Sequence, residues 1–250
     1  MAGLKKLHLE LGGKGMAIVL DDADPSFAAS KCAEGSLKGS GQRCDAISAV
    51  LVVEKIAERF VEELVKRVDS YWKIGDPRDK GVNMGPLISE KAAKRVQELV
   101  DDAVKRGARL LRGGQHSGAY FEPTVLDVVP KDSRIALEET FGPVVTIIRI
   151  ENEEEAIEFG KKSPYGLDSC VFTNDFYRMW KVAKSLVVGG VTINDLPEHG
   201  VGFFPFGGSK ESGIGREGIG YSVDEMTELK TIVFNLKPGG LGKPLRSHRV

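Results

Sequence analysis

The sequence has few cysteines and no long apolar runs. Three cysteines in 250 residues, without paired spacing, argue against a disulfide scaffold and favour a reducing cytoplasm. The longest apolar stretches, residues 47–53 and 144–148, are far shorter than the roughly 20 residues that span a bilayer. The N-terminus, Met-Ala-Gly-Leu-Lys-Lys, has no apolar signal core. We therefore expect a cytoplasmic protein with no targeting segment and no membrane partner.

Charge of one sign is also lacking. Lys and Arg number 35 against 36 Asp and Glu, a net charge of −1, so nothing favours nucleic acid as a partner. The four histidines are scattered without ligand spacing, and we expect no metal. Hydrophobic residues make up 41% and charged residues 28%, as in an ordinary globular domain with a real core.

Strand and helix patterns alternate along the chain. Short strands are expected over residues 7–11 and 16–20, and buried or later strands over 47–53, 144–150, 167–173 and 190–194. Helices are expected over 25–37, 55–69, 153–162 and 175–185, with another beginning after Ser89 and stopping at Gly107. This order predicts an α/β fold, a doubly wound and mostly parallel sheet with helices on both faces.

The beginning of the chain is unusual, because a hydrophobic strand starts near residue 4 with nothing before it to cover it. This feature favours a chain cut from something larger. The alternative is an edge strand at a natural N-terminus.

Cys44 is the first candidate for chemistry. It follows Arg43 on a glycine-containing loop, where a cation favours thiolate and free backbone amides could hold an oxyanion. Cys32 and Cys170 instead lie within apolar patterns and are interpreted as buried hydrophobes. From local context alone, the same interpretation stays open for Cys44.

Two acidic segments are the next candidates. Glu10 stands between leucines before a glycine turn, where partial desolvation would raise its pKa toward that of a useful base. Glu138 and Glu139 precede Phe141 and a Gly-Pro turn, where a carboxylate could accept hydrogen bonds from sugar hydroxyls. Solvent-facing positions on an edge strand or helix end are the alternatives for all three carboxylates.

A glycine-rich loop over residues 204–215 carries exposed aromatic residues and suits a pocket wall. Residues 213–218 also match the Gly-x-Gly-x-x-Gly dinucleotide pattern. A polar loop rather than a strand precedes them, so we reject that match.

Four motifs together resemble the aldehyde dehydrogenase superfamily. Their order matches the family, and Glu10 precedes Cys44 by 34 residues, as the family's base precedes its nucleophile. The resemblance covers residues 4 to about 236, roughly the second, catalytic half of a family chain, and so implies that the N-terminal, cofactor-binding half is absent. The motifs are Glu10-Leu11-Gly12-Gly13-Lys14, Gly41-Gln42-Arg43-Cys44, Glu139-Thr140-Phe141-Gly142-Pro143 and Pro205-Phe206-Gly207-Gly208.

The resemblance implies a role for each matched residue. Cys44 is the nucleophile and Glu10 the general base of aldehyde oxidation with NADP or NAD. Glu139, Phe141 and Leu11 contact the cofactor, with Glu139 on the nicotinamide ribose. Arg43 and Phe206 contact the aldehyde.

Within the family, the chain looks most like the non-phosphorylating glyceraldehyde-3-phosphate dehydrogenases, and Arg43 suits the phosphate of such a substrate. One departure weakens this assignment. Those enzymes often carry a further Arg before the Pro-Phe-Gly-Gly motif, where this chain has Glu198 within Leu196-Pro197-Glu198-His199-Gly200. A non-phosphorylated short-chain aldehyde is therefore the alternative substrate.

The resemblance divides the chain into a catalytic domain (1–229), an oligomerisation strand (230–236) and a basic tail expected to be disordered (237–250). The strand resembles a segment that pairs with a neighbouring subunit, so we expect a homo-oligomer, a homotetramer in this family. A different possibility is an assembly module that complements a separate cofactor-binding chain. An acyl-CoA reductase of the superfamily is disfavoured, because those enzymes typically lack the glutamate at position 10.

Overall fold

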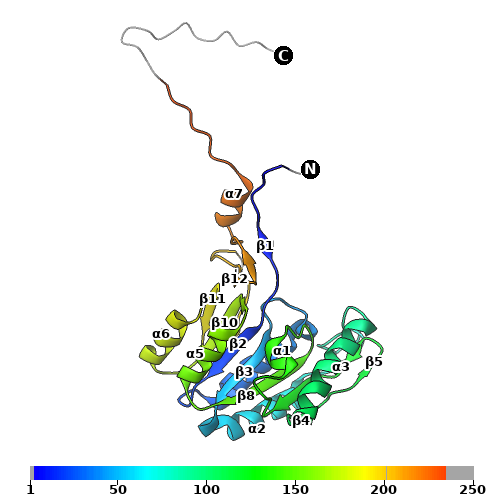
Figure 1. Ribbon diagram of the computed structural model, residues 1–250. Coiled ribbons are helices and arrows are strands. Elements are labelled where there is room, and N and C mark those ends of the chain that lie inside the picture. Colours follow the sequence, from blue (N-terminus) through cyan, green and yellow to red (C-terminus); the bar gives the residue numbers. More distant parts are fainter. Residues whose placement is uncertain (1–2, 201, 235–250) are drawn as a thin grey trace, which may run out of the picture.

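A seven-stranded sheet forms the centre of the protein, for which a computed structural model describes residues 3–200 and 202–234. The strand order is β11-β10-β2-β3-β8-β7-β4, and all neighbours run parallel except β4 and β7 (Figure 1). The predicted α/β fold is confirmed. The strands are β2 (Gly15–Val19), β3 (Ile47–Val53), β4 (Arg109–Arg112), β7 (Thr124–Asp127), β8 (Val144–Ile150), β10 (Asp168–Phe172) and β11 (Gly190–Ile193).

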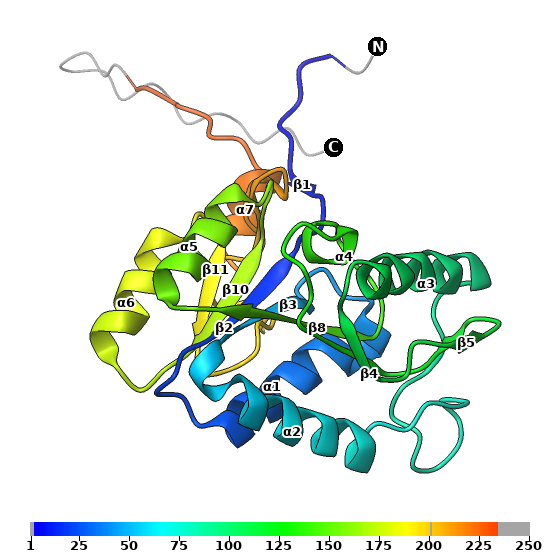
Figure 2. The same cartoon turned by 60° about the horizontal axis from the view of Figure 1, so that its bottom comes forward.

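Helices cover both faces of this sheet, as Figure 2 shows. Helices α1 and α2 bury their apolar residues in one core, and α3, α5 and α6 contribute to a second core on the other face. The helices are α1 (Pro25–Leu37), α2 (Glu54–Tyr71), α3 (Glu90–Lys105), α4 (Arg134–Leu137), α5 (Glu153–Lys162), α6 (Phe176–Ser185) and α7 (Tyr221–Met226).

Strand β3 is apolar at every position except the buried Ser48, because it lies between two cores. Ala49 and Leu51 belong to one core, while Val50 and Val52 belong to the other. A central parallel strand with helices on both sides has no solvent face, and alternation with polar residues disappears.

Several predicted boundaries agree with the structure. Strands 47–53 and 144–150 and helix 25–37 have the expected limits. The Asp24 side chain accepts hydrogen bonds from the backbone N–H groups of Ser26 and Phe27, and Ser89 accepts one from Ala92. These caps satisfy donors that the first helical turn leaves free.

The N-terminal segment lies beside α7, next to the layered body (Figure 1). Strand β1 (Leu9–Glu10) pairs antiparallel with β13 (Gly213–Ile214), and Lys6 Nζ donates to the Thr227 carbonyl at 2.6 Å. The strand expected over 7–11 is thus shorter than predicted and lies outside the main sheet. The other small elements are β5 (His116–Ser117), β6 (Tyr120–Phe121), β9 (Tyr165–Gly166), β12 (Ser209–Lys210) and the 3₁₀ helix η1 (Lys38–Gly41).

The strand predicted over 230–236 is expected to pair with another subunit, so a single chain does not test it. Residues 230–234 form no strand, and Val233 is 83% exposed. A strand needs a hydrogen-bonding partner, and a single chain offers none here. Residues 235–236 and the tail 237–250 lie outside the described residues, and pairing with another subunit stays a prediction.

Two strands of the sheet were not predicted. The β4 sequence is Arg-Leu-Leu-Arg at an exposed edge, and β7 is only four residues long. The helices of residues 3–200 and 202–234 include none with the length and apolarity to cross a membrane. Gly213–Ile214 pairs antiparallel with β1 rather than following a parallel strand, so the rejected dinucleotide pattern lacks its required context.

Candidate active site

Three of the sequence motifs lie immediately before three neighbouring parallel strands. Gly13 precedes β2, Cys44 precedes β3 and Phe141 precedes β8, and these strands are adjacent in the order β2-β3-β8. Because the strands are parallel, their amino ends lie on the same side of the sheet, and the three motifs converge there. Ligands of open α/β sheets usually bind at the carboxyl ends of the strands. The sheet type alone would therefore have indicated the opposite side.

Cys44 and Glu10 line one hollow of about 630 Å³, although they are 34 positions apart in the chain. A thiol and a carboxylate in a common cavity can act on one substrate in turn. The residues lining the hollow are Glu10, Lys38, Gln42, Arg43, Cys44, Asp45, Phe141, Glu198 and His199.

The loop before Cys44 is held in an unusual backbone conformation. Ser40 and Gly41 have positive φ angles of 58° and 67°. Ser40 Oγ donates to the Gly85 carbonyl at 2.8 Å, and Gln42 Oε1 accepts from the Ile88 N–H at 2.7 Å. A Cβ on Gly41 would lie 2.1 Å from the Gly142 carbonyl oxygen. Only glycine therefore fits where the nucleophile loop crosses the segment that leads into β8.

The surroundings of Cys44 disfavour its thiolate. Burial, together with the nearby Glu10 and Asp45 carboxylates, raises the pKa of the Cys44 thiol to about 11. The backbone N–H groups of Asp45 and of Cys44 itself act in the opposite direction. Such N–H groups are also the kind of donor that stabilises an oxyanion.

The expectation that Arg43 favours the thiolate is wrong. Its guanidinium turns away to donate to the Gly35 carbonyl at 3.2 Å and pairs with Asp45 at 3.5 Å. Arg43 is next to Cys44 in the sequence, but its guanidinium does not lie at the Cys44 sulfur. A long arginine side chain turns to the acceptors around it, here Gly35 and Asp45.

Glu10 is exposed, so the desolvation expected from its leucine neighbours is absent. Its side chain accepts a hydrogen bond from the Gly12 N–H at 3.1 Å. This contact orients the carboxylate from its own turn and leaves its other oxygen, Oε2, without a hydrogen-bond donor in residues 3–200 and 202–234.

Glu139 is held by the turn that also carries Glu10. Its Oε1 accepts a hydrogen bond from the Gly13 N–H at 3.1 Å, while among the described residues Oε2 accepts none. The buried Lys14 donates to the Ile135 carbonyl at 2.6 Å and to Thr140 Oγ1 at 3.1 Å. Burial lowers the Lys14 pKa to about 7, against the opposing charge of Glu139. The base-bearing turn and the segment of Glu139 are thus tied together.

The remaining predicted contacts differ in position. Phe141 is 43% exposed and lines the hollow with Cys44. Phe206 is buried and does not line the hollow; its ring lies 4.3 Å from that of His199, centroid to centroid. The Leu11 side chain is exposed and is not among the lining residues. Phe206 therefore supports the wall from behind.

Sequence reasoning missed much of the wall. Asp45 is buried, and its Oδ2 accepts a hydrogen bond from the His199 N–H at 3.2 Å, which joins the nucleophile loop to the segment after β11. Lys38 and Glu198, which both line the hollow, form an ion pair at 2.5 Å. Burial raises the pKa of the nearby Asp168 to about 6, with Asp45 adding to the shift. The only signal in the sequence was a carboxylate directly after the candidate nucleophile.

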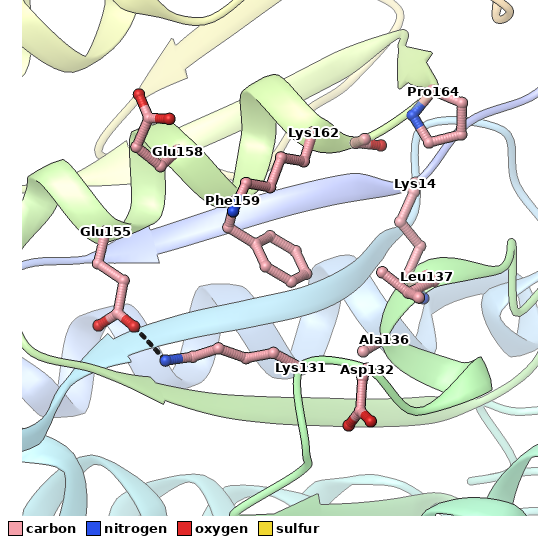
Figure 3. A pocket seen from close by; sticks show the side chains of 11 residues that line it. Lys14, Lys131, Asp132, Ala136, Leu137, Glu155, Glu158, Phe159, Lys162 and Pro164 are labelled. Carbon is pink, nitrogen blue, oxygen red and sulfur yellow. Dashed lines mark hydrogen bonds and ion pairs between the residues drawn. The ribbon is translucent and has the colours of Figure 1, made fainter.

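A second hollow, of about 350 Å³, lies beside Lys14 (Figure 3). The Phe159 ring and Leu137 point into it, and Lys131 pairs with Glu155 at its side. It is lined by neither Cys44 nor Glu10 and is not part of the candidate active site. Across the described ranges, no group of three His, Cys, Asp or Glu side chains could hold a metal ion.

The fold and the shared thiol–carboxylate cavity agree with the family profile that the sequence matches. The "Aldehyde dehydrogenase family" profile matches residues 1–232. The chain belongs to the aldehyde dehydrogenase family.

Relatives with two different names are equally similar to the chain. It is 43% identical over 236 residues to a "NADP-dependent glyceraldehyde-3-phosphate dehydrogenase" of Streptococcus equinus, covering 94% of this chain and 49% of that protein. It is 43% identical over 234 residues to a "Lactaldehyde dehydrogenase" of Methanocaldococcus jannaschii, covering 94% and 50%. The chain spans about half the length of the curated relatives it matches.

A solved structure agrees with the fold. The crystal structure of a NADP-dependent glyceraldehyde-3-phosphate dehydrogenase from Bacillus halodurans, complexed with NADP, superposes with a TM-score of 0.89 at 43% identity. The match covers 92% of this chain and 48% of that one.

Proposed function

We propose that this chain carries the catalytic cysteine and general base of a NADP-dependent aldehyde dehydrogenase that oxidises a short aldehyde to its acid. The observation that carries the proposal is the single hollow lined by both Cys44 and Glu10. Its relatives' names and the family membership support the reaction class.

The chemistry needs a sulfur nucleophile, because a bare aldehyde carbon does not release hydride. Cys44 first loses its thiol proton to water. The thiolate sulfur then bonds to the carbonyl carbon, and the π electron pair of the carbonyl moves to oxygen to give the oxyanion of a thiohemiacetal. The N–H groups near Cys44 hold that oxyanion. A nicotinamide cofactor, when bound, supplies the hydride acceptor.

Loss of hydride leaves a thioester on Cys44, which water must cleave. Glu10 takes a proton from that water while the water oxygen attacks the thioester carbon. The carbon–sulfur bond then breaks, the acid leaves and the Cys44 thiolate is restored. Each step uses one of the two groups that the hollow brings together.

Glu139 suits the cofactor. Its Oε1 is fixed by the Gly13 N–H, and its Oε2 remains available to accept hydrogen bonds from ribose hydroxyls. Glu139 does not itself line the hollow, but Phe141, two residues further along the chain, is exposed in its wall and offers an apolar surface for the nicotinamide. We assign NADP rather than NAD from the names of the relatives and of the solved structure. Glyceraldehyde 3-phosphate and lactaldehyde are the two aldehydes that those names suggest.

The proposal is tested with an activated ester, which acylates a cysteine without any cofactor. The chain is mixed with 4-nitrophenyl acetate at pH 9, and nitrophenol release is followed. We expect Cys44→Ser to lose at least about a hundredfold in rate. Glu10→Gln is expected to release about one equivalent rapidly and then slow down, because its thioester is hydrolysed slowly.

Cys32→Ser is the matched control, since Cys32 is buried in the core away from the hollow. It is expected to behave as the unmodified chain. Undiminished hydrolysis by Cys44→Ser would remove the nucleophile assignment, and the absence of a burst in Glu10→Gln would remove the assigned base.

A further inference from the structure

The charged groups around Cys44 are arranged in opposite pairs. The hollow is lined by two cations, Lys38 and Arg43, and by three carboxylates, Glu10, Asp45 and Glu198. With His199 neutral, this lining has a net charge of −1. We propose that the part of the site supplied by this chain selects an uncharged aldehyde over a phosphorylated one, and that Asp45 and Glu198 impose the selection. The inference rests on the proposed function, because it concerns the aldehyde that reaches Cys44.

Arg43 is the cation nearest the nucleophile in the chain, and it is already occupied. One terminal nitrogen donates to the Gly35 carbonyl at 3.2 Å, and the other lies 3.5 Å from Asp45. Asp45 is held in turn by the His199 N–H. A phosphate is bound best by two parallel guanidinium N–H bonds. Here one terminal nitrogen is taken by a backbone carbonyl and the other faces a buried carboxylate, while Nε is buried without a partner among the described residues. A phosphate can therefore take both terminal nitrogens only if these two contacts are broken.

Lys38 is also paired. Its Nζ lies 2.5 Å from Glu198, and both side chains are about half exposed, so the pair stands at the rim of the hollow. Glu198 lies on the segment after β11 and is one of the residues that line the hollow. A phosphate dianion at this rim meets a carboxylate instead of a free cation, which disfavours its approach.

Glu10 adds a negative charge with no cationic partner among the described residues. Its one hydrogen bond comes from the Gly12 N–H. An uncharged aldehyde is not repelled by this carboxylate. Overall similarity does not decide the question, because the relatives named for the phosphorylated and unphosphorylated aldehydes are both 43% identical to the chain. The pairing of charges in the hollow is what favours the uncharged aldehyde.

The test compares D-glyceraldehyde with D-glyceraldehyde 3-phosphate, which differ only in the phosphate group. Each is titrated against alkylation of Cys44 by iodoacetamide, followed by intact-protein mass spectrometry. Thiohemiacetal formation protects the sulfur, and the other two cysteines are fully buried. We expect glyceraldehyde to half-protect Cys44 at a concentration at least fivefold lower than its phosphate does.

The measured ratio is the half-protecting concentration of the phosphorylated aldehyde divided by that of glyceraldehyde. Glu198→Gln is expected to lower this ratio at least threefold, because it frees Lys38 and removes a negative charge at the rim. Asp45→Asn, which frees Arg43, is the second variant. Glu158→Gln is the matched control, since Glu158 also pairs with a lysine at the surface but lies outside this hollow. It is expected to leave the ratio unchanged.

Equal or better protection by the phosphorylated aldehyde overturns the inference and leaves the proposed function intact. If neither Glu198→Gln nor Asp45→Asn changes the ratio, the inference is likewise overturned and the proposed function stands. If neither aldehyde protects Cys44, the nucleophile assignment itself fails, and the inference fails with it.

Discussion

At the scale of single residues, the reactivity of Cys44 is set by carboxylates rather than by the arginine beside it. Burial, Glu10 and Asp45 raise the pKa of the Cys44 thiol to about 11, so most molecules carry a protonated thiol at neutral pH. A carboxylate close to the sulfur is what a base for thioester hydrolysis requires. The same closeness disfavours the thiolate, so the two demands oppose each other in the free chain.

This opposition predicts the pH dependence of Cys44 alkylation. With a pKa of about 11, the rate with iodoacetamide is expected to rise about tenfold per pH unit between pH 7 and 10. Glu10→Gln removes a negative charge that disfavours thiolate, so the pKa falls and alkylation at pH 8 becomes about two- to tenfold faster. Glu158→Gln is the control. A slower reaction in Glu10→Gln would contradict the charge argument.

At the scale of elements, the site depends on how closely the nucleophile loop crosses the segment before β8. Gly41 has no room for a side chain against the Gly142 carbonyl. The loop is also joined to residues 85–88 by Ser40 and Gln42. These contacts fix where Cys44 lies relative to Phe141, its neighbour in the wall.

Gly41→Ala is expected to destabilise the fold more than a glycine substitution in open space. Alanine at a positive φ costs about 1–2 kcal/mol at either place, and the clash at Gly41 adds about 1–3 kcal/mol. Gly81→Ala is the matched control, because Gly81 has a φ of 85° and no atom of the described residues lies within 4 Å of the place that an alanine Cβ would occupy. Urea unfolding measures both losses. Equal losses of unfolding free energy in the two variants would mean that the Cys44 loop does not pack tightly against the segment before β8.

At the scale of the whole molecule, the chain spans about half the length of its curated relatives. In the proposed function it supplies the nucleophile, the base and one carboxylate for the ribose. We expect this chain, incubated with NADP and D-glyceraldehyde, to show no steady increase in absorbance at the wavelength of NADPH, while ester hydrolysis at Cys44 persists. Both are measured in one preparation, with Cys44→Ser as the control. Sustained NADP reduction by the chain alone would contradict the expectation that it retains ester hydrolysis but not dehydrogenase activity.

Sequence patterns were enough to predict the layered fold, because the central strands β3 and β8 are mostly apolar and the helices repeat their apolar residues every three to four positions. Both 47–53 and 144–150 were predicted with their observed limits. Motif order was enough to nominate Cys44, Glu10 and Glu139. Local patterns succeed here because burial on both faces and helix capping are short-range constraints.

The surroundings of those residues depend on how the chain folds. The tertiary structure turned Arg43 to Asp45, paired Glu198 with Lys38, buried Phe206 behind His199 and left residues 230–234 unpaired. Flexible charged side chains take partners from segments far away in the chain, and an edge strand forms only when something pairs with it. The charge that a substrate meets is therefore a property of the assembled wall, and no single stretch of sequence contains it.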